Sequence, residues 1–479
     1  MAGLRTLGRH RTRGRCRRRG SGEKGGFRYA FAAEVSEEIE ALVGPGAVDG
    51  WDFEAIETAA RRRALSLAAR AIAQRLNADH SDYVGPTVPC VSCQQLARYA
   101  GRHTKTFETV LGPLTLQRAY YHCARCDAGL CPRDRALGLV DTSLSPAVTR
   151  MVGLVGAMVS FAEGHELLHE LASVEVETKQ VERTAEALGR AIAADERRVV
   201  ELSPPTAPTM YLGMDGTGIP MRVVELEGRA GKQPDGSAKT REVKLCTVWT
   251  AEARDPEGIA VRDRGSVSYS AAIESAATRD TDETPSDFAA RVDREARRRG
   301  FDQATRRVVL GDGAVWIWNV ADEQFPGAIQ IVDLCHAKGH LSDVAKAIYG
   351  APSDLAAHWA QQRYDELDEG NLVGLLQAVR AHADTNQEAA KCVGYLTRNQ
   401  GRLRYPEFRA QGLCVSTGVV ESGCKLAIAT RLKRGGMHWS VAGADAIIAL
   451  RCCKLSGRFE DFWERRASAV AGPAGERAS

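Results

Sequence analysis

The sequence lacks any apolar run of about 18 residues, the length that a membrane-spanning helix needs. The most apolar stretch, residues 151–161, is shorter and is followed closely by Glu163 and His165. A secretory signal is also missing, because no apolar segment follows the arginine-rich N-terminus. We therefore expect no membrane partner and a cytoplasmic location, where the 13 cysteines are free thiols or bind metal where their spacing allows.

A strong excess of either charge is missing as well. The 64 Lys and Arg residues nearly balance the 61 Asp and Glu residues, so the formal net charge of +3 says nothing about partners. Basic residues cluster locally, above all in residues 1–26, whose Arg- and Gly-rich composition predicts disorder. This tail is a basic arm on DNA phosphates, an unstructured leader, or sequence upstream of the natural start codon, and we favour the last two.

The length of 479 residues predicts about two to four domains. Shifts in composition and clusters of Pro or Gly divide the chain into segments. The expected segments are a disordered basic tail (1–26), an N-terminal helical segment (27–85), a zinc ribbon (86–135), a helical DNA-binding region that is either a helix-turn-helix or a plain helical hairpin (136–205), the first part of an α/β core (206–336), an all-α insertion (337–412), the last part of the core (413–466) and a loose tail (467–479).

The core segment has the pattern of an α/β fold. Strands are predicted over residues 209–215, 241–250, 265–273, 307–311 and 328–334, a helix over 287–299, and later helices over 419–434 and 442–454. Asp215 ends the first predicted strand, Asp312 follows the fourth, and Glu421 lies at the start of a later helix. Because the ends of adjacent central strands lie close together, these three acids are expected to converge.

Such convergence suits phosphodiester chemistry. Two divalent ions about 3.5–4 Å apart activate the attacking oxygen and stabilise the leaving one. Mg²⁺ and Mn²⁺ prefer carboxylate oxygens, so Asp215, Asp312 and Glu421 are the predicted ligands. The glycines that flank both aspartates are expected to leave room for a phosphate backbone. An Asp-Gly pair is also a common turn, and it is the combination of three acids that favours a catalytic site.

Three motifs surround these acids. They are Tyr211-Leu-Gly-Met-Asp-Gly-Thr-Gly-Ile-Pro-Met221, Val309-Leu-Gly-Asp-Gly-Ala-Val-Trp-Ile-Trp318, and Gly418-Val-Val-Glu-Ser-Gly-Cys-Lys425 followed by Arg431-Leu-Lys-Arg-Gly-Gly-Met-His-Trp439. Together they resemble the motifs of bacterial insertion-sequence transposases of the ISKra type, over roughly residues 85–465. The resemblance implies the DDE mechanism, with Asp215, Asp312 and Glu421 as catalytic residues.

The resemblance also implies an α/β RNase H-like catalytic core with an all-α insertion, beside an N-terminal helical region and a small zinc ribbon. It implies a nucleoid-associated enzyme of the bacterial cytoplasm that uses Mg²⁺ or Mn²⁺ in DNA transposition and DNA recombination. Its partners would be transposon ends, target DNA and a second copy of the chain, in a homodimer on DNA. Two alternatives stay open: an RNase H-like nuclease without strand transfer, and a transposase-derived, non-catalytic DNA-binding protein.

A fourth motif, Asp333-Leu-Cys-His336, is similar to the D-x-x-H signature of mutator-like transposases. It predicts an accessory catalytic role for Asp333 and His336, either in orienting a scissile phosphate or in supporting the metal ligands. His336 and His340 lie one helical turn apart, a spacing that also suits a metal. No acid completes a zinc site there, so we favour a hydrogen-bonded structural histidine.

Two C-x-x-C pairs, Cys90 with Cys93 and Cys123 with Cys126, predict a structural Zn²⁺ site with four thiolate ligands. The 29 residues between the pairs exceed the usual spacing of about 15–20. Two strand-like runs inside this spacer predict a zinc ribbon with a long hairpin. Four free buried thiols are the alternative, and Cys131 is a candidate substitute ligand.

Basic residues near Glu421 predict contacts with the phosphates of the transposon end. The candidates are Lys425, Arg431, Lys433, Arg434 and Arg451. Trp439 either stacks on an unpaired base or packs in the core, and packing is the safer prediction. The basic residues of the ribbon, among them Arg102, Arg118 and Arg133, either contact DNA or form an ordinary solvated surface.

Overall fold

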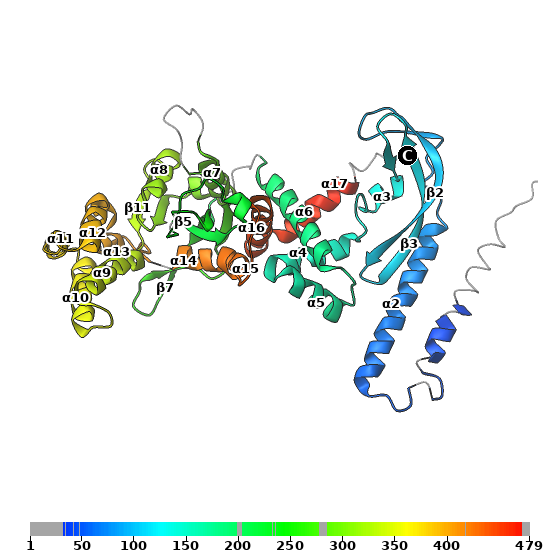
Figure 1. Cartoon of the computed structure of the whole chain (residues 1–479), viewed down its shortest axis with the longest axis horizontal. Coiled ribbons are helices and arrows are strands. Elements are labelled where there is room, and N and C mark those ends of the chain that lie inside the picture. Colours follow the sequence, from blue (N-terminus) through cyan, green and yellow to red (C-terminus); the bar gives the residue numbers. More distant parts are fainter. Residues whose placement is uncertain are drawn as a thin grey trace, which may run out of the picture. The chain divides into compact units, whose positions relative to one another are not determined.

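The computed structural model describes residues 32–33, 35–41, 43–46, 48–198, 204–231, 233–234, 236–276, 285–416 and 418–471, with backbone alone for 467–471. The basic tail predicted over residues 1–26 and most of the predicted loose tail, 472–479, lie outside these ranges. The chain divides into two compact units, residues 1–145 and 146–479 (Figure 1). None of the helices within the described ranges is long and apolar enough to span a membrane.

The first unit joins a long helix to a four-stranded antiparallel sheet. Helix α2 (Phe53–Asn77) begins after Asp52, whose side chain caps it by accepting a hydrogen bond from the Ala55 N–H at 2.8 Å. The strands, in spatial order, are β1 (Thr87–Pro89), β2 (Leu96–Thr109), β3 (Gly112–Cys123) and β4 (Ala128–Leu130), and α3 (Pro132–Ala136) follows. Strands β2 and β3 form the long hairpin that the sequence predicts between the cysteine pairs.

The second unit begins with three helices, in the stretch where the sequence predicts helix. They are α4 (Pro146–Met158), α5 (Phe161–Ala172) and α6 (Thr178–Glu196). Ser160 and Glu163 form a reciprocal capping box at the start of α5. Helix α6 packs closely on α16 (Val441–Leu455) at Gly189, where an added Cβ would lie 2.0 Å from the Ala446 carbonyl oxygen. Only a residue without a side chain allows this approach.

A five-stranded mixed sheet forms the centre of the second unit. Its strands are β5 (Thr209–Pro220), β6 (Thr240–Thr250), β9 (Ser268–Ala272), β10 (Arg306–Gly311) and β11 (Ile329–Val332), with a small separate hairpin of β7 (Ala253–Arg254) and β8 (Ala260–Val261). The spatial order is β11-β10-β5-β6-β9; β5, β6 and β9 are antiparallel, and β10 and β11 run parallel to β5. The predicted mixed α/β fold is confirmed.

Helices cover both faces of this sheet, which explains its apolar strands. Helix α7 (Asp287–Arg299) connects β9 to β10 with the bounds that the sequence predicts, and α8 (Val315–Gln324) connects β10 to β11. Phe288 and Val292 on the apolar side of α7 are fully buried. Every residue of β6 from 243 to 250 is buried as well, as expected for a strand covered on both faces.

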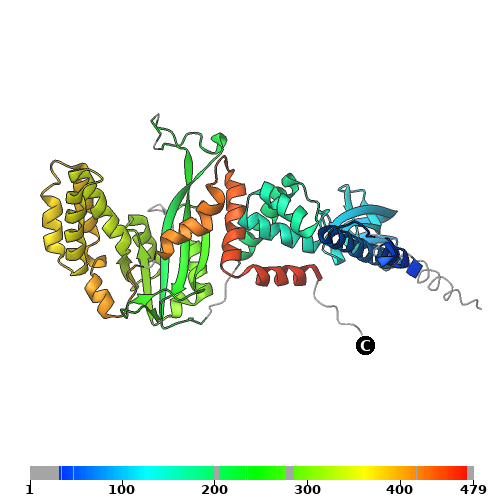
Figure 2. The same ribbon diagram turned by 90° about the horizontal axis from the view of Figure 1, so that it is seen from below.

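A helical bundle follows β11 and lies beside the β11 edge of the sheet (Figures 1 and 2). Its helices are α9 (Leu334–Tyr349), α10 (Asp354–Asp368), α11 (Leu372–Arg380), α12 (Gln387–Arg398) and α13 (Tyr405–Ala410). Ser353, Asn371 and Asn386 each cap a helix by accepting a backbone N–H. These helices occupy the stretch from 337 to about 400 in which the sequence contains no strand signal.

The C-terminal helices return to the sheet. They are α14 (Val419–Gly423), a π-helical turn (Cys424–Ala429), α15 (Thr430–Leu432), α16 and α17 (Phe459–Ala471). The sequence predicts one helix over residues 419–434, and the π-helical turn interrupts it. Such turns are frequent at functional sites because they shift the side chains that follow around the helix axis.

A buried network of ion pairs joins several of these helices. Glu295 is fully buried, and its two carboxylate oxygens lie 2.8 Å from Nη1 of Arg458 and 2.6 Å from Nη1 of Arg298. Arg458 also pairs with Glu196 of α6 at 3.3 Å. Although burial opposes ionisation, Arg458 and Arg298 lower the pKa of Glu295 to about 2. The network therefore ties α6, α7 and the start of α17 together.

Replacing Glu295 with alanine should destabilise the second unit by about 3–5 kcal/mol, because Arg458 and Arg298 would lose their buried counter-charge. The pKa of Glu295 in the folded protein lies below the unfolded value of about 4.3, so this contribution is complete at neutral pH and is lost as the pH falls towards about 2. Urea unfolding at neutral pH and at about pH 3 measures it, and the difference between variant and wild type should shrink at the lower pH.

The matched control is Glu460→Ala, which breaks an exposed pair with Arg150 at 2.5 Å and should have little effect. Equal loss of stability in both variants would contradict the role given to the buried network.

Candidate active site and metal centre

Asp215 lies inside β5 rather than at its end. The predicted end of the strand was wrong, because β6 pairs with β5 all the way to Pro220 and the Asp-Gly pair does not turn. The pairing of β5 with β10, by contrast, ends at Met214 opposite Gly311. Asp215 and Asp312 are therefore the first residues beyond the last pair of two adjacent parallel strands.

The charges of the two aspartates act on each other. Burial raises the pKa of Asp215, and the negative charge of Asp312 raises it further. The thiol of Cys424 and the N–H of Gly216 act in the opposite direction by donating hydrogen bonds to Asp215. On balance the pKa of Asp215 is raised, so its negative charge is unfavourable in this structure. A bound cation would stabilise that charge.

The backbone around Asp312 is held from two sides. Its Oδ1 accepts a hydrogen bond from the Ala314 N–H at 2.8 Å, and its carbonyl oxygen accepts one from the Tyr395 hydroxyl at 2.9 Å. Gly313 has a φ of 99°, and a Cβ there would lie 2.4 Å from the Tyr395 ring. Only glycine fits this turn, so the loop that carries Asp312 is fixed against α12.

Glu421 reaches the same face of the sheet on α14. Gly213, two residues before Asp215 and on the same face of β5, allows the helix to come close, because a Cβ there would lie 2.4 Å from Cγ2 of Val420. The Glu421 side chain is 54% exposed, and its Oε1 lies 2.7 Å from Nζ of Lys425. Lys425 lowers the pKa of Glu421 through this hydrogen bond and its charge.

Gly213, Gly311 and Gly313 are covered by protein, so for these three the expectation that the glycines leave room for a phosphate backbone was wrong, whereas Gly216 and Gly218 are only half-buried. Val420 occupies the space beside Gly213, and a Cβ on Gly311 would lie 2.8 Å from Cγ2 of Ile317. The turn at Gly313 is filled in the same way. These glycines serve close packing around the site instead.

Asp333 is the N-cap of α9. Its buried carboxylate accepts hydrogen bonds from the Cys335 N–H at 2.8 Å and from the Ser416 hydroxyl at 3.2 Å. Its own N–H donates to the Gly311 carbonyl oxygen at 2.8 Å, just before Asp312. These bonds make Asp333 a positioning residue, which connects α9 to the end of β10.

His336 lies in the electric field of the acids. Its Nδ1 is 3.8 Å from Oδ1 of Asp333, which raises the pKa of His336, and the charges of Asp312 and Asp215 raise it further. His340, one turn later, packs against Tyr395 with ring centroids 4.1 Å apart, and burial lowers its pKa. The two histidines therefore have different environments, which does not favour a shared metal site.

The residues predicted for the site share one electrostatic environment. The charge of Asp312 raises the pKa of Asp215, both aspartates raise the pKa of His336, and His336 contributes to lowering the pKa of Glu421. The ligand atoms of the three acids do not all lie within 4.8 Å of one another; in the described part of the chain, only the cysteine cluster below meets that distance. Carboxylate oxygens suit Mg²⁺ or Mn²⁺, and Glu421 would have to turn away from Lys425 to join the aspartates.

Two residues of this site were missed as functional candidates. Cys424 was not among the predicted site residues, although its position three residues after Glu421 places both on one side of the helix, which is a usable signal. Its buried thiol donates to Asp215. Tyr395, which holds the Asp312 loop, carries no sequence signal, because it lies 83 residues away in the helical bundle.

Four cysteines of the first unit, Cys90, Cys93, Cys123 and Cys126, form a cluster that could hold a metal ion. The sulfur of Cys90 lies 3.6 Å from that of Cys126, and the sulfur of Cys93 lies 3.6 Å from that of Cys123. All four sulfur atoms lie within 4.8 Å of one another. Such separations fit four thiolates around one Zn²⁺ at about 2.3 Å each, so this cluster suits a zinc ion.

Backbone N–H groups and neighbouring sulfur atoms change the pKa values of the thiols in this cluster. The N–H groups of Cys93 and Ser92 point at the sulfur of Cys90 and lower its pKa to about 6, which favours the thiolate that zinc binds. Although a backbone hydrogen bond lowers the pKa of Cys126, the neighbouring sulfur atoms of Cys93 and Cys90 raise it to about 12, because close thiolates repel one another unless a cation lies between them. Cys131, the candidate substitute ligand, lies at the start of α3 and is not part of the cluster.

Purified protein should contain about one Zn²⁺ per chain, and Cys93→Ser should reduce this towards zero, because a closed structural site needs all four ligands. Metal analysis by mass spectrometry measures the content, and proteolysis of the β2–β3 hairpin reports whether the ribbon is folded. Cys131→Ser is the control and should keep its zinc. Loss of zinc in the control, or its retention in Cys93→Ser, would contradict this assignment.

Two predicted DNA-binding residues are buried. The guanidinium of Arg431 lies over the rings of Phe161 and Trp439, and its Nε donates to the Gly156 carbonyl oxygen at 3.1 Å. The indole N–H of Trp439 donates to the Leu432 carbonyl oxygen at 3.0 Å. Neither side chain offers a surface to DNA, so we leave both out of the DNA-binding set. Trp439 packs in the core, as the safer prediction had it.

The other basic residues near Glu421 have different partners. Arg451 is buried and donates to the Leu426 carbonyl oxygen, so it is also unsuited to DNA. Arg434 pairs with Glu163, and Nζ of Lys433 donates to the Thr217 hydroxyl. Lys425, Lys433 and Arg434 remain the basic side chains beside the site that a phosphate could reach.

Arginines of the ribbon pair within the first unit. Arg102 pairs with Asp82 at 3.0 Å, and Arg118 pairs with Asp134 in a buried contact. Arg133 is buried too, 3.2 Å from Asp82. These three side chains stabilise the ribbon rather than form the solvated surface or DNA contact that the sequence left open.

Comparisons with known proteins add little to this geometry. No protein-family model matches the chain, and no curated protein matches its sequence. Among solved structures, the Drosophila P element transposase strand transfer complex aligns with 71% of this chain and 86% of its own, at 9% identity and a TM-score of 0.24. A likeness this distant carries no argument about fold or function.

Replacing Asp215 with asparagine removes a buried negative charge beside Asp312 and keeps the shape of the side chain. We expect the metal-free variant to be more stable than wild type by about 0.5–2 kcal/mol, as is common when a strained functional site is relieved. Mn²⁺ should raise the thermal unfolding temperature of wild type but not of this variant. Thermal unfolding with and without Mn²⁺ is the measurement.

Asp343→Asn, at an exposed position of α9, is the control and should respond to Mn²⁺ as wild type does. An equal response to Mn²⁺ in Asp215→Asn and wild type would exclude Asp215 as a ligand.

Proposed function

We propose that this chain is a DDE transposase of a bacterial insertion sequence, similar to the ISKra type, which cleaves transposon ends and joins them to target DNA. The observation that carries the proposal is the pairing of β5 with β10, which ends immediately before Asp215 and Asp312. Glu421 approaches the same face of the sheet. This pairing supports a shared site for the three motifs that resemble this family, although they lie far apart in the sequence.

The topology of the second unit supports the proposal. Three antiparallel strands, a helix, a parallel strand, a second helix and a second parallel strand follow one another along the chain. This is the order expected for an RNase H-like core. The helical bundle α9–α13 then lies between the second and third acids, where the all-α insertion is proposed.

The acids fit Mg²⁺ or Mn²⁺ by their donor chemistry and by the unfavourable burial of Asp215. Asp215, Asp312 and Glu421 would hold such ions, which would supply activation of the attacking oxygen and stabilisation of the leaving oxygen. Lys425, once Glu421 turns away from it, becomes free to contact a phosphate. His336, whose pKa is raised by Asp333, adds positive charge where the phosphodiester would lie.

The remaining parts would hold DNA. The zinc ribbon and the α5–α6 hairpin are the proposed DNA-binding modules, and exposed Lys179 and Arg183 on α6 suit phosphate contacts. A homodimer on DNA would let two active sites act on two transposon ends. Contacts of this kind position the DNA without reading its sequence.

The test uses purified full-length protein and labelled linear DNA that carries the ends flanking its own gene, with Mg²⁺ or Mn²⁺. We expect cleavage at the ends and a joined product on a denaturing gel. Asp215→Ala, Asp312→Ala and Glu421→Ala should each reduce both products by more than about 100-fold, since even residues behind metal ligands commonly cost 10–100-fold.

Glu388→Ala, an exposed acid on α12, is the control and should retain activity. Cleavage without joined product would identify the nuclease alternative instead. Specific binding without metal-dependent cleavage would identify a non-catalytic DNA-binding protein and contradict the catalytic role of the three acids.

A further inference from the structure

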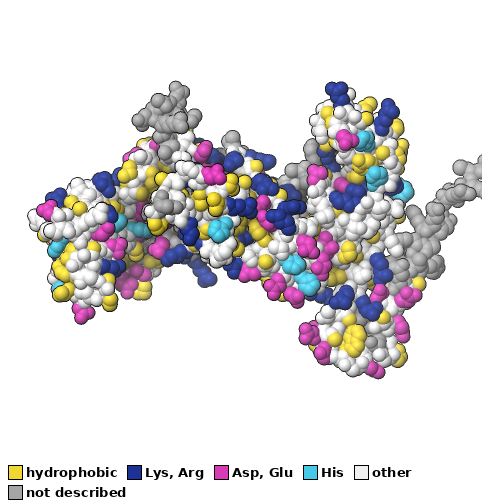
Figure 3. Space-filling model, in the orientation of Figure 1, with side chains coloured by type: hydrophobic (Ala, Val, Ile, Leu, Met, Phe, Trp, Pro, Cys, Tyr) yellow, Lys and Arg dark blue, Asp and Glu magenta, His cyan; other side chains and the backbone are white. Residues whose placement is uncertain are grey.

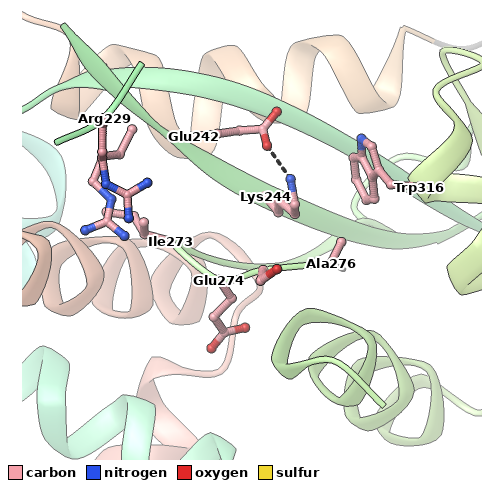
Figure 4. Close-up of a pocket in the computed structure, with 9 residues that line it drawn as sticks. Arg229, Glu242, Lys244, Ile273, Glu274, Ala276 and Trp316 are labelled. Carbon is pink, nitrogen blue, oxygen red and sulfur yellow. Dashed lines mark hydrogen bonds and ion pairs between the residues drawn. The ribbon is translucent and has the colours of Figure 1, made fainter. Parts of the chain in front are cut away.

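A hollow of about 470 Å³ lies beside the first half of β6, at the carboxyl end of β5. Arg229, Arg241 and Lys244 line it together with Glu274 and Trp316. Figure 4 shows Arg229 on one side of the hollow and Trp316 on the other, with Lys244 between them. Its side chains come from the connection after β5, from β6, from residues 273–276 after β9 and from α8.

The acids of this hollow are already neutralised. Glu242 pairs with Lys244, and both oxygens of Glu274 accept hydrogen bonds from Arg291, at 2.8 and 2.7 Å. Arg229 and Arg241, by contrast, have no side-chain hydrogen bond or ion pair with any residue that the structure describes. The charge of Arg241 acts on the nearby carboxylate of Asp445, whereas the guanidinium group of Arg229 is exposed. The hollow therefore presents two guanidinium groups without a direct ion pair in the described part of the chain, and it suits an anion.

Trp316 fixes the position of the third cation. Nζ of Lys244 lies 4.5 Å from the centre of its ring, and Phe288 packs edge-on against it at 5.6 Å. Lys244 is only 8% exposed, so it forms the floor of the hollow. Lys244 covers one face of the Trp316 indole ring. Trp316 therefore positions the ammonium group of Lys244, and that face of the ring cannot stack on a nucleobase. The expected ligand is a phosphate group rather than a nucleobase.

The hollow and the three acids lie at the same end of the sheet. Lys244 is paired with Gly216, and Leu245 with Asp215. Successive side chains of a strand point to opposite faces, so Lys244 lies on the face opposite Asp215 and Arg241 on the same face as Asp215; the hollow is therefore lined from both faces. Trp316 is four residues beyond Asp312 on α8. A DNA strand bound at the acids could pass around this end of the sheet to reach the hollow.

We propose that this hollow binds the phosphate backbone of the DNA substrate, with Arg229 and Arg241 as the contacting residues. The inference rests on the proposed function and adds a substrate-binding site at the edge of the sheet beyond the carboxyl end of β5. Because the contacts are to phosphate, binding here is independent of base sequence.

The experiment measures the affinity of the full-length protein for a labelled duplex of arbitrary sequence over a range of salt concentrations. Each neutralised phosphate contributes about 0.9 to the slope of log affinity against log salt, so R229A/R241A should lower that slope by about 1.8. R229K/R241K should keep the wild-type slope, since a lysine supplies the same charge. A second duplex of different sequence should give the same changes.

R262A/R264A is the matched control, because it removes two arginines from the connection before β9, at the other end of the sheet. Unchanged binding in R229A/R241A, or an equal loss in the control, would overturn this inference while leaving the proposed function intact. Absence of DNA binding by wild type would instead overturn both. Loss of binding in R229K/R241K as well would mean that the arginines act through folding, and would also overturn it.

Discussion

The parallel pairing of β5 with β10 is the contact on which the proposed site depends. Its last pair, Met214 opposite Gly311, fixes the backbone positions of the two residues that follow. Asp215 and Asp312 are 97 positions apart in the sequence, yet the ladder makes them neighbours. Since β5 is also paired with β6 beyond this point, Asp215 is held in a regular strand, which is more rigid than a loop.

The rest of the second unit fixes that end of the sheet and leaves one acid adjustable. Tyr395 and Asp333 hold the backbone on either side of Asp312 through direct hydrogen bonds. Glu421, on a short helix followed by a π-helical turn, is half exposed and paired with Lys425. Asp215 and Asp312 are fixed, whereas the Glu421 side chain can turn. This arrangement suits a site in which the third ligand moves into place when metal and DNA bind.

Local signals predicted much of this fold. The amphipathic pattern of residues 287–299 predicted the bounds of α7 correctly, and the two C-x-x-C pairs predicted a cluster whose sulfur atoms do meet. What failed depends on partners distant in the sequence. Asp215 looked like a strand end because Asp-Gly favours turns, and Arg431 looked solvent-exposed because nothing nearby reveals the aromatic rings of Phe161 and Trp439 around it.

The central claim is that β5 and β10 together build a divalent-metal site, and anomalous X-ray diffraction from crystals soaked in Mn²⁺ tests it most directly. The account predicts an anomalous peak within about 2.0–2.6 Å of carboxylate oxygens of both Asp215 and Asp312, with Glu421 turned away from Lys425. A peak bound to other residues, or none beside these aspartates in crystals that also contain DNA, would contradict it.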